Sequence, residues 1–302
     1  MSTPGKIPAD EVDLARWSAG TVMLCADDFA MTEGVSRGIV ELAETGHISA
    51  TSALVTTPHW RSHARNLALL GPRILPGLHI NLTLGRPLGA MPQLAPDGAL
   101  PPVGKLIRAS LTARLPLGEI EAEIARQIAR FSSEMGHLPR FIDGHQHVHA
   151  LPQVRVAFFR ALACFRDQPG WPAIWLRDPA DRLGPIIARG VAVPKALMVA
   201  ALSRGFAADV EAAGLSTNVG FAGFSDFDVR KPYGAELARC FAQAGPRHLI
   251  MCHPGYPDAE LALLDPVTGR RRQELEVLRE EAGGHRARIW RPAVPANRQG
   301  AP

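Results

Sequence analysis

Polar, titratable residues stand at the carboxyl ends of five short apolar segments. The segments cover residues 22–26, 74–78, 141–142, 174–176 and 249–252. The residues that follow them are Asp27 and Asp28, His79, Asp143 and His145, Arg177, and His253. In parallel α/β folds the carboxyl ends of the strands converge on one face, where active sites form. Five such endings in one chain predict that these side chains share one site.

The residue types at these positions suit a divalent cation. One carboxylate and two imidazoles form a typical ligand set that leaves positions open for water and substrate. The segment 143–149 supplies His145, His147 and His149 at alternate positions. In an extended segment these rings share one face, so one or two of them could reach an ion. A single histidine is more often structural, but three within five residues favour a ligand.

The adjacent carboxylates of Asp27 and Asp28 suggest two different roles. Neighbours in an extended chain point to opposite sides, so one can bind an ion while the other faces a water molecule. The alternative is a turn or helix cap, because aspartate commonly caps helices. Thr32 with Glu33 could form that cap without them. His253 begins a Pro/Gly turn that would fix its ring at the rim, although a structural histidine is the alternative there.

The remaining histidines lie away from the predicted strand ends, and we assign them no role. They are His47, His59, His63, His137, His248 and His285. The chain has no G-x-G-x-x-G, Walker or G-x-S-x-G pattern. We consider four aromatic residues as candidates to stack on a ring of the substrate, although each could equally belong to the core or surface. They are Trp60, Phe224, Phe227 and Tyr256.

Strand-like and helix-like segments alternate along most of the chain. We expect strands at 21–26, 48–55, 74–79, 140–142, 173–176, 217–221 and 248–252, and a weaker one at 286–290. We expect helices at 33–44, 117–135, 154–163, 195–213, 234–244 and 271–281. This alternation predicts an α/β fold with mainly parallel strands, closed or partly closed as a TIM-barrel-like, distorted β/α barrel.

Proline and glycine mark the loops that would surround the site. The segments 86–105 and 177–194 follow predicted strands, which places them on the rim of a barrel. Whether they form a substrate lid or a surface excursion stays open. We expect an N-terminal extension at 1–20, a single barrel domain at 21–291 and a disordered tail at 292–302.

Composition excludes several classes of protein. The 302 residues are 46% hydrophobic and 21% charged, which is typical of a globular chain and not of a disordered one. No run approaches the ~18 apolar residues of a membrane span. The net charge of +4 is small, and the basic run 270–272 leads into Glu274 and Glu276 as a solvated helix start would. We therefore expect no nucleic-acid partner.

Cysteine usage and the start of the chain favour the cytoplasm. The four cysteines are scattered without a C-x-x-C pair, so they predict buried, reduced thiols. The first residues lack the apolar core of a secretion signal. The sequence does not determine the oligomeric state, and a homo-oligomer is compatible with it.

Five ordered blocks resemble the YdjC/ChbG-like (ChbG/HpnK) carbohydrate deacetylase family. The blocks cover residues 26–29, 46–52, 77–83, 143–149 and 251–255, within a resemblance that spans about 21 to 280. The resemblance implies a TIM-barrel-like fold and metal-dependent removal of an acetyl group from an N-acetylated saccharide, chito-oligosaccharide-like or lipid-linked. It also implies one divalent ion, and mixed oxygen and nitrogen ligands suit either Mg²⁺ or Zn²⁺.

The resemblance also assigns roles to individual residues. It implies that Asp28, His79 and His145 bind the metal ion, that Asp27 is the base and that His253 is the acid. The choice of His145 over the two later histidines rests on the resemblance alone. Two departures occur, since Ala30 stands where relatives commonly have glycine and Gln146 where many have histidine.

We expect Arg177 to orient Asp27 by a two-point contact and to keep it ionised. Two other kinds of function remain open. The first is a metal-dependent phosphoesterase or sugar isomerase on the same barrel, although two-metal phosphoesterases usually need more bridging carboxylates. The second is a non-catalytic carbohydrate-binding protein, which would have no use for an acid and a base together.

Overall fold

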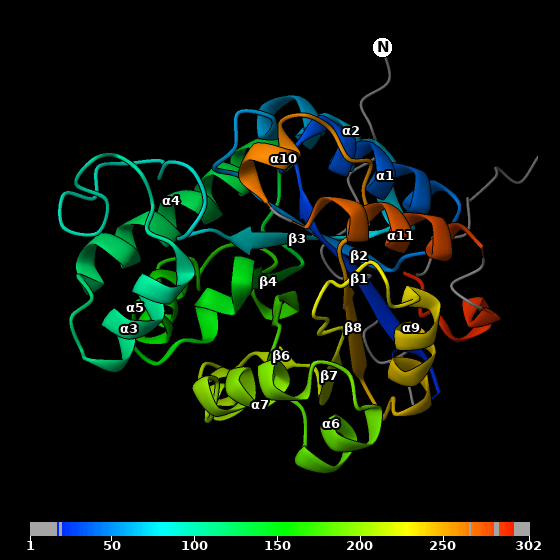
Figure 1. Cartoon of the computed structure of the whole chain (residues 1–302). Helices are drawn as coiled ribbons and strands as arrows, with labels where there is room; N and C mark the ends of the chain where they lie inside the picture. Colours follow the sequence, from blue (N-terminus) through cyan, green and yellow to red (C-terminus); the bar gives the residue numbers. More distant parts are fainter. Residues whose placement is uncertain (1–16, 18–19, 266, 281–283, 293–302) are drawn as a thin grey trace, which may run out of the picture.

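Eight parallel strands form one curled sheet in the computed structural model, which describes residues 17, 20–265, 267–280 and 284–292 (Figure 1). The strand order is β6-β5-β4-β3-β2-β1-β8-β7. The strands are β1 (Val22–Phe29), β2 (Ala50–Ala53), β3 (Leu75–Ile80), β4 (Phe141–Gly144), β5 (Trp175–Leu176), β6 (Ser216–Thr217), β7 (Gly220–Ala222) and β8 (His248–Cys252). The prediction of a distorted, barrel-like α/β fold with mainly parallel strands is confirmed.

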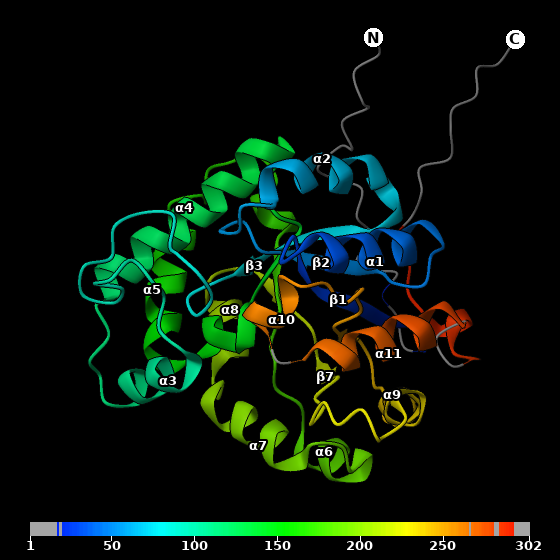
Figure 2. The same cartoon turned by 45° about the horizontal axis from the view of Figure 1, so that its top comes forward.

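Helices surround the sheet on its outer side, as the two views in Figures 1 and 2 show. They are α1 (Glu33–Glu44), α2 (Trp60–Leu70), α3 (Val103–Leu111), α4 (Leu117–Met135), α5 (Pro152–Ala163), α6 (Leu183–Arg189), α7 (Val193–Leu202), α8 (Phe206–Ala212), α9 (Tyr233–Ala242), α10 (Leu261–Leu264) and α11 (Thr268–Arg279). Short 3₁₀ helices lie at η2 (Gly71–Arg73), η3 (His145–Ala150), η4 (Trp171–Ala173) and η5 (Arg286–Arg288). None of the helices in the described part of the chain is long and apolar enough to cross a membrane.

Local sequence signals account for the best predicted helices. Helix α4 has the expected bounds, and its apolar face is buried at Ile120, Ile124 and Ile128. It ends at Gly136, whose φ of 76° is the left-handed conformation that glycine adopts at helix ends. Helix α1 also has the expected bounds, and the hydroxyl of Thr32 caps it by accepting from the Val35 amide at 3.3 Å. The aspartates before it are therefore not the cap.

Two predicted segments are divided in the structure. The predicted strand at 217–221 is two strands, because β6 pairs with β5 while β7 pairs with β8 at the other edge of the sheet. The chain crosses between these edges at Asn218, whose side-chain amide donates to the carbonyls of Asp178 and Gly220. The predicted helix at 195–213 breaks into α7 and α8 before Gly205, whose φ is 87°.

Three further expectations differ from the structure. The weak strand predicted at 286–290 is wrong, because 286–288 forms η5 and the only described pairing is a single bridge from Ile289 to Val22. Helices α2, α3, α6 and α10 were not predicted. All four cysteines are free, but Cys164 is exposed, so the expectation of buried thiols is wrong at that position.

The predicted terminal segments mostly lie outside the described residues. Of the N-terminal extension at 1–20, Trp17 is buried and its ring lies 5.6 Å from that of Trp175 on β5. Of the tail predicted at 292–302, only residue 292 is described. The predicted loop at 86–105 is irregular until α3 begins, and the loop at 177–194 contains α6.

Candidate active site

The residues at the strand ends meet around one cavity of about 420 Å³. Five of them line it: Asp27, Asp28, His79, His145 and His253. Arg177 does not line the cavity, but its buried guanidinium donates hydrogen bonds to Asp27, which does. These residues come from five different strands or their following loops, which places the site at the carboxyl edge of the sheet.

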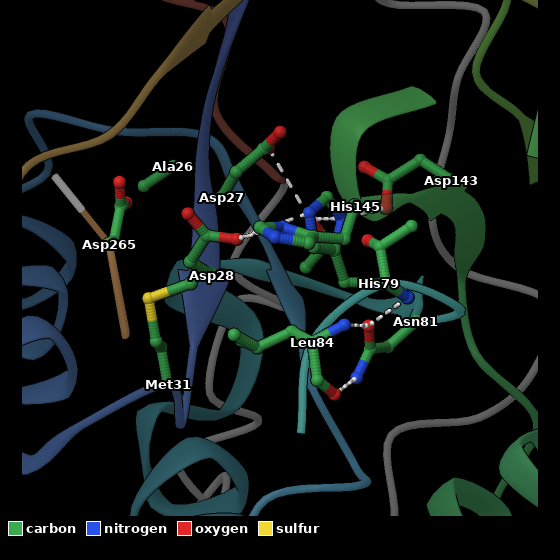
Figure 3. A network of polar contacts seen from close by, with 12 residues as sticks. Ala26, Asp27, Asp28, Met31, His79, Asn81, Leu84, Asp143, His145 and Asp265 are labelled. Carbon is green, nitrogen blue, oxygen red and sulfur yellow. Dashed lines mark hydrogen bonds and ion pairs between the residues drawn. The ribbon is translucent and has the colours of Figure 1, made fainter. Parts of the chain in front are cut away.

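Asp28, His79 and His145 converge so that one ligand atom from each lies within 4.8 Å of the others. The Oδ1 atom of Asp28 is 2.9 Å from Nδ1 of His145 and 3.3 Å from Nε2 of His79. Figure 3 shows this carboxylate directed toward the His145 ring. Two imidazole nitrogens and one carboxylate oxygen form a donor set that a divalent cation can use.

The register of the sheet orients His79. Strands β3 and β4 pair so that His79 and Asp143 are direct neighbours, and Nδ1 of His79 donates to Oδ1 of Asp143 at 2.5 Å. This contact leaves Nε2 directed toward Asp28, and such partners commonly fix the ring of a metal-binding histidine. Burial opposes protonation of His79, but the charge and hydrogen bond of Asp143 outweigh it and raise the pKa to about 10, so an ion that binds at Nε2 would displace a proton from this ring.

The end of β1 adopts an unusual backbone that separates the two aspartates. Asp28 has a φ of 68° and Ala30 a φ of 67°. Both values lie in the left-handed region, which residues other than glycine rarely adopt. At position 30 the resemblance leads one to expect glycine. Ala30 keeps the left-handed backbone conformation in which glycine would be favoured. The Ala30 amide donates to the Ser36 hydroxyl at 3.0 Å, which holds this turn against α1.

Arg177 binds the carboxylate of Asp27 at two points. Its Nη1 and Nη2 atoms donate to the two oxygens of Asp27 at 2.7 and 2.6 Å, and Nη2 also contacts Asp143. All three side chains are buried. Burial alone would raise the pKa of Asp27, but the guanidinium charge overrides it and holds that pKa well below its usual range. Asp27 is therefore ionised at neutral pH.

Of the three histidines in 143–149, the structure places only His145 in the described ligand cluster. We expected an extended segment, and this is wrong because the chain turns at Gln146 and His147, which have φ values of 53° and 61°, into η3. Alternate residues therefore do not share a face. His147 instead packs edge-on against Phe221 and Phe224.

His149 binds the backbone of Arg177 and so helps to position that residue. Its Nε2 donates to the carbonyl of Arg177 at 2.8 Å, at the end of β5. Burial lowers the pKa of His149 to about 4, so the ring is neutral. Its edge contacts with Phe158 and Phe206 tie this support to the core.

His253 lies on the cavity wall directly after β8. Its backbone amide donates to Oε2 of Glu274 on α11 at 2.5 Å, and its ring lies edge-on to Phe227 at 5.6 Å. Burial lowers the pKa of the His253 ring to about 4. Burial also raises the pKa of the Glu274 carboxyl to about 7.

Arg271 and Asp265 line the cavity and were missed at the sequence level. Arg271 donates from Nη2 to Oδ2 of Asp28 and to Oδ2 of Asp265, both at 2.6 Å. The interpretation of 270–272 as a solvated helix start is wrong, because Arg270 and Arg271 are each only 1% exposed. The basic run itself was the only signal in the sequence, and it did not distinguish a buried ion pair from a solvated face.

Apolar side chains form the outer walls of the cavity. They come mainly from α3, α7 and the segment around α10, and include Ile107, Met198, Leu202 and Leu264. Of the aromatic residues considered for sugar stacking, Phe227 lines the cavity. Trp60 does not, because its ring is buried and stacks on Phe131 at 5.5 Å.

Comparison with known proteins identifies similar chains. The model of the family described as YdjC-like protein matches residues 21–284. A chitooligosaccharide deacetylase of Serratia marcescens is 32% identical over 254 residues, which cover 84% of this chain and 88% of that protein. A chitooligosaccharide deacetylase of Klebsiella pneumoniae subsp. pneumoniae is 35% identical over 237 residues, covering 77% of this chain and 81% of that one.

A solved structure supports the fold. It is that of a proposed cellobiose-phosphate cleavage protein from Enterococcus faecalis V583, with a TM-score of 0.64 and 21% identity. The alignment covers 89% of this chain and 95% of that one. At this identity the likeness concerns the arrangement of strands and helices.

Proposed function

The chain belongs to the YdjC-like protein family, and we propose that it is a metal-dependent carbohydrate N-deacetylase that hydrolyses the acetamide of an N-acetylated amino sugar and releases acetate. One observation carries this proposal. A set of three ion-ligand side chains, an arginine-bound carboxylate and the half-buried imidazole of His253 meet at a single cavity. The names of the Serratia and Klebsiella relatives support the same class of reaction.

Asp28 Oδ1, His79 Nε2 and His145 Nδ1 would hold the divalent ion. Arg271 binds the other oxygen of Asp28, so Oδ1 is the oxygen directed at the imidazoles. A bound ion would polarise the acetamide carbonyl and lower the pKa of a water molecule beside it. The mixed ligand set suits either Mg²⁺ or Zn²⁺.

Asp27 would act as the general base that removes the proton from the attacking water. Arg177 fixes both carboxylate oxygens and keeps the group ionised, so it is ready to accept a proton at neutral pH. A positioned general base contributes roughly 10²- to 10⁴-fold to a rate. The same arginine makes Asp27 a weaker base, because its low pKa lies far from neutrality.

His253 would deliver a proton to the departing amine. Its lowered pKa makes the ring neutral in the resting chain at pH 7, so it is not an imidazolium before substrate binds. The proton must therefore be gained during turnover, and the proton taken from water is a source within the same cavity. Asp27 and Asp28 both raise the proton affinity of His253 electrostatically, which favours this transfer.

The apolar walls favour a lipid-linked sugar over a free chito-oligosaccharide. The polar residues gather at the base of the cavity, whereas α3 and α7 line its outer part with aliphatic side chains. Burial of such surface is worth about 25 cal/mol per Å², so an apolar group attached to the sugar would gain binding energy there. Lys195, whose ammonium lies 4.5 Å from the Phe227 ring centre, is a polar contact on the same wall.

A screen of acetate release tests this proposal. Chito-oligosaccharides and a glycolipid carrying N-acetylglucosamine would be incubated with the protein and either Mg²⁺ or Zn²⁺, beside the Asp28→Asn variant. We expect acetate from at least one substrate and a large loss in the variant. Phosphate release from an added sugar phosphate, without acetate release from the other substrates, would favour a phosphoesterase. Sugar binding without either product would favour a non-catalytic carbohydrate-binding protein.

A further inference from the structure

A second group of side chains that could bind an ion lies outside the cavity, where helices α1 and α2 begin. Glu33 is the first residue of α1, His59 immediately precedes α2, and His63 is one turn further along α2. One ligand atom from each of these three residues lies within 4.8 Å of the others. None of the three lines the cavity described above.

The spacing of the two histidines suits a shared ion. They are four residues apart in helical backbone, so both rings lie on one face of α2, with centres 6.0 Å apart. Nε2 of His63 is already 3.0 Å from Oε2 of Glu33. Two histidines one turn apart with a carboxylate from another element form a ligand pattern that zinc proteins use.

The burial of His63 points independently to a ligand. Its side chain is only 3% exposed, and among the described residues Nδ1 has no hydrogen-bond partner. Buried polar atoms without partners are uncommon in folded proteins.

A fourth donor stands beside His59. Glu260 precedes α10, and its Oε2 atom is 2.8 Å from Nε2 of His59. The contact joins the loop after β8 to the residue that precedes α2. Leu264 on α10 and the following Asp265 line the cavity, so this cluster holds one wall of the candidate active site.

We propose that Glu33, His59 and His63 form a second divalent-cation site, with Glu260 as a further oxygen ligand. Two imidazoles favour Zn²⁺, Ni²⁺ or Co²⁺ over Mg²⁺. An ion held there ties the α10 wall of the cavity to α1 and α2. The site is independent of the proposed deacetylase reaction and of the ion at Asp28.

Zn²⁺ binding to the Asp28→Asn chain tests this site, because that substitution removes the only carboxylate charge of the Asp28, His79 and His145 cluster and so weakens ion binding there. Equilibrium dialysis with metal analysis should give one tightly bound Zn²⁺ per chain. Adding His59→Ala or Glu33→Gln should weaken that binding at least about 10-fold, since loss even of groups behind metal ligands costs 10- to 100-fold. Both positions are accessible enough that the fold should tolerate the change.

The control is Glu44→Gln, an exposed carboxylate at the other end of α1, which should leave Zn²⁺ affinity unchanged. As a second measurement, Zn²⁺ should raise the Tm of Asp28→Asn and not that of Asp28→Asn with His59→Ala. An Asp28→Asn chain that binds no Zn²⁺, or that keeps its affinity after His59→Ala, would overturn the site. Neither result depends on whether acetate is released.

Discussion

Asp27 and Asp28 are adjacent in the sequence, yet their carboxylates are bound by different side chains. Arg177 holds Asp27, whereas His79, His145 and Arg271 surround Asp28. The left-handed backbone at Asp28 supports this separation, since it turns the chain at the end of β1. The pair can therefore supply one carboxylate to an ion and another to a water molecule.

Replacing Asp27 by asparagine should separate catalysis from ion binding. Asp27→Asn cannot accept a proton, so we expect kcat for acetate release to fall roughly 10²- to 10⁴-fold while the bound metal content is unchanged. Acetate assays and metal analysis on the same preparation measure both. Asp97→Asn, on the exposed part of the 86–105 loop, is the matched control. A near-wild-type rate in Asp27→Asn would show that the base is elsewhere.

Substitutions in the ligand cluster should act on the ion itself. Asp28→Asn removes the negative charge of the carboxylate ligand and His79→Ala removes a donor nitrogen, so we expect each to lose most of the ion bound at the Asp28 cluster. Asp143→Asn keeps all three donors but removes the charge that orients His79, and should weaken ion binding about 10- to 100-fold. Isothermal titration with the activating metal ranks the variants. Equal affinity in Asp28→Asn and the wild type would rule out Asp28 as a ligand.

Arg177→Lys should reveal whether the arginine tunes the base. Lysine retains the charge but not the two-point contact, so the pKa of Asp27 should rise toward its usual value. The acid limb of kcat/KM should then move to higher pH, and kcat should fall on the order of 100-fold through misplacement of Asp27. A lower Tm with an unmoved pH profile would indicate that Arg177 only stabilises the fold.

Glu274 should make stability depend on pH near neutrality. Burial raises its folded pKa to about 7 from the ordinary 4.5, so the native chain binds a proton in this window that the unfolded chain has released. Its contribution to the free energy of unfolding is therefore full below about pH 4.5 and is lost as pH rises through 7. The glutamine side chain of the Glu274→Gln variant cannot ionise, so the free energy of unfolding of the variant should not fall in this way as the pH rises.

Urea unfolding of the wild type and Glu274→Gln at pH 5 and pH 8 measures the effect. The stability of the variant relative to the wild type should be higher at pH 8 than at pH 5, by roughly 1–3 kcal/mol. Glu280→Gln, exposed at the end of α11, should show no such change. The same difference at both pH values would mean that Glu274 does not titrate in this range.

Local sequence patterns determined much of the fold. The periodicity of 117–135 and the cap at Thr32 fix helices whose bounds agree with the structure, because these signals act within a few residues. Apolar runs ending in polar residues located the strand ends and hence the region of the site. The segment at 217–221 was misread because its division depends on pairing with β5 and β8, which are distant in sequence.

Tertiary structure alone decided which polar residues meet. Arg271 reaches Asp28 across 243 positions, and no local pattern distinguishes it from the exposed Arg272 beside it. The left-handed backbone of Gln146 and His147 turns the chain directly after His145, so the later histidines do not join the Asp28 cluster. The sequence determined where each strand ends in a charged or polar residue, because an apolar run followed by a polar residue can be recognised within a few positions. The structure decided how those charges pair, because a charge is stable inside a protein only where the fold brings an opposite charge to it.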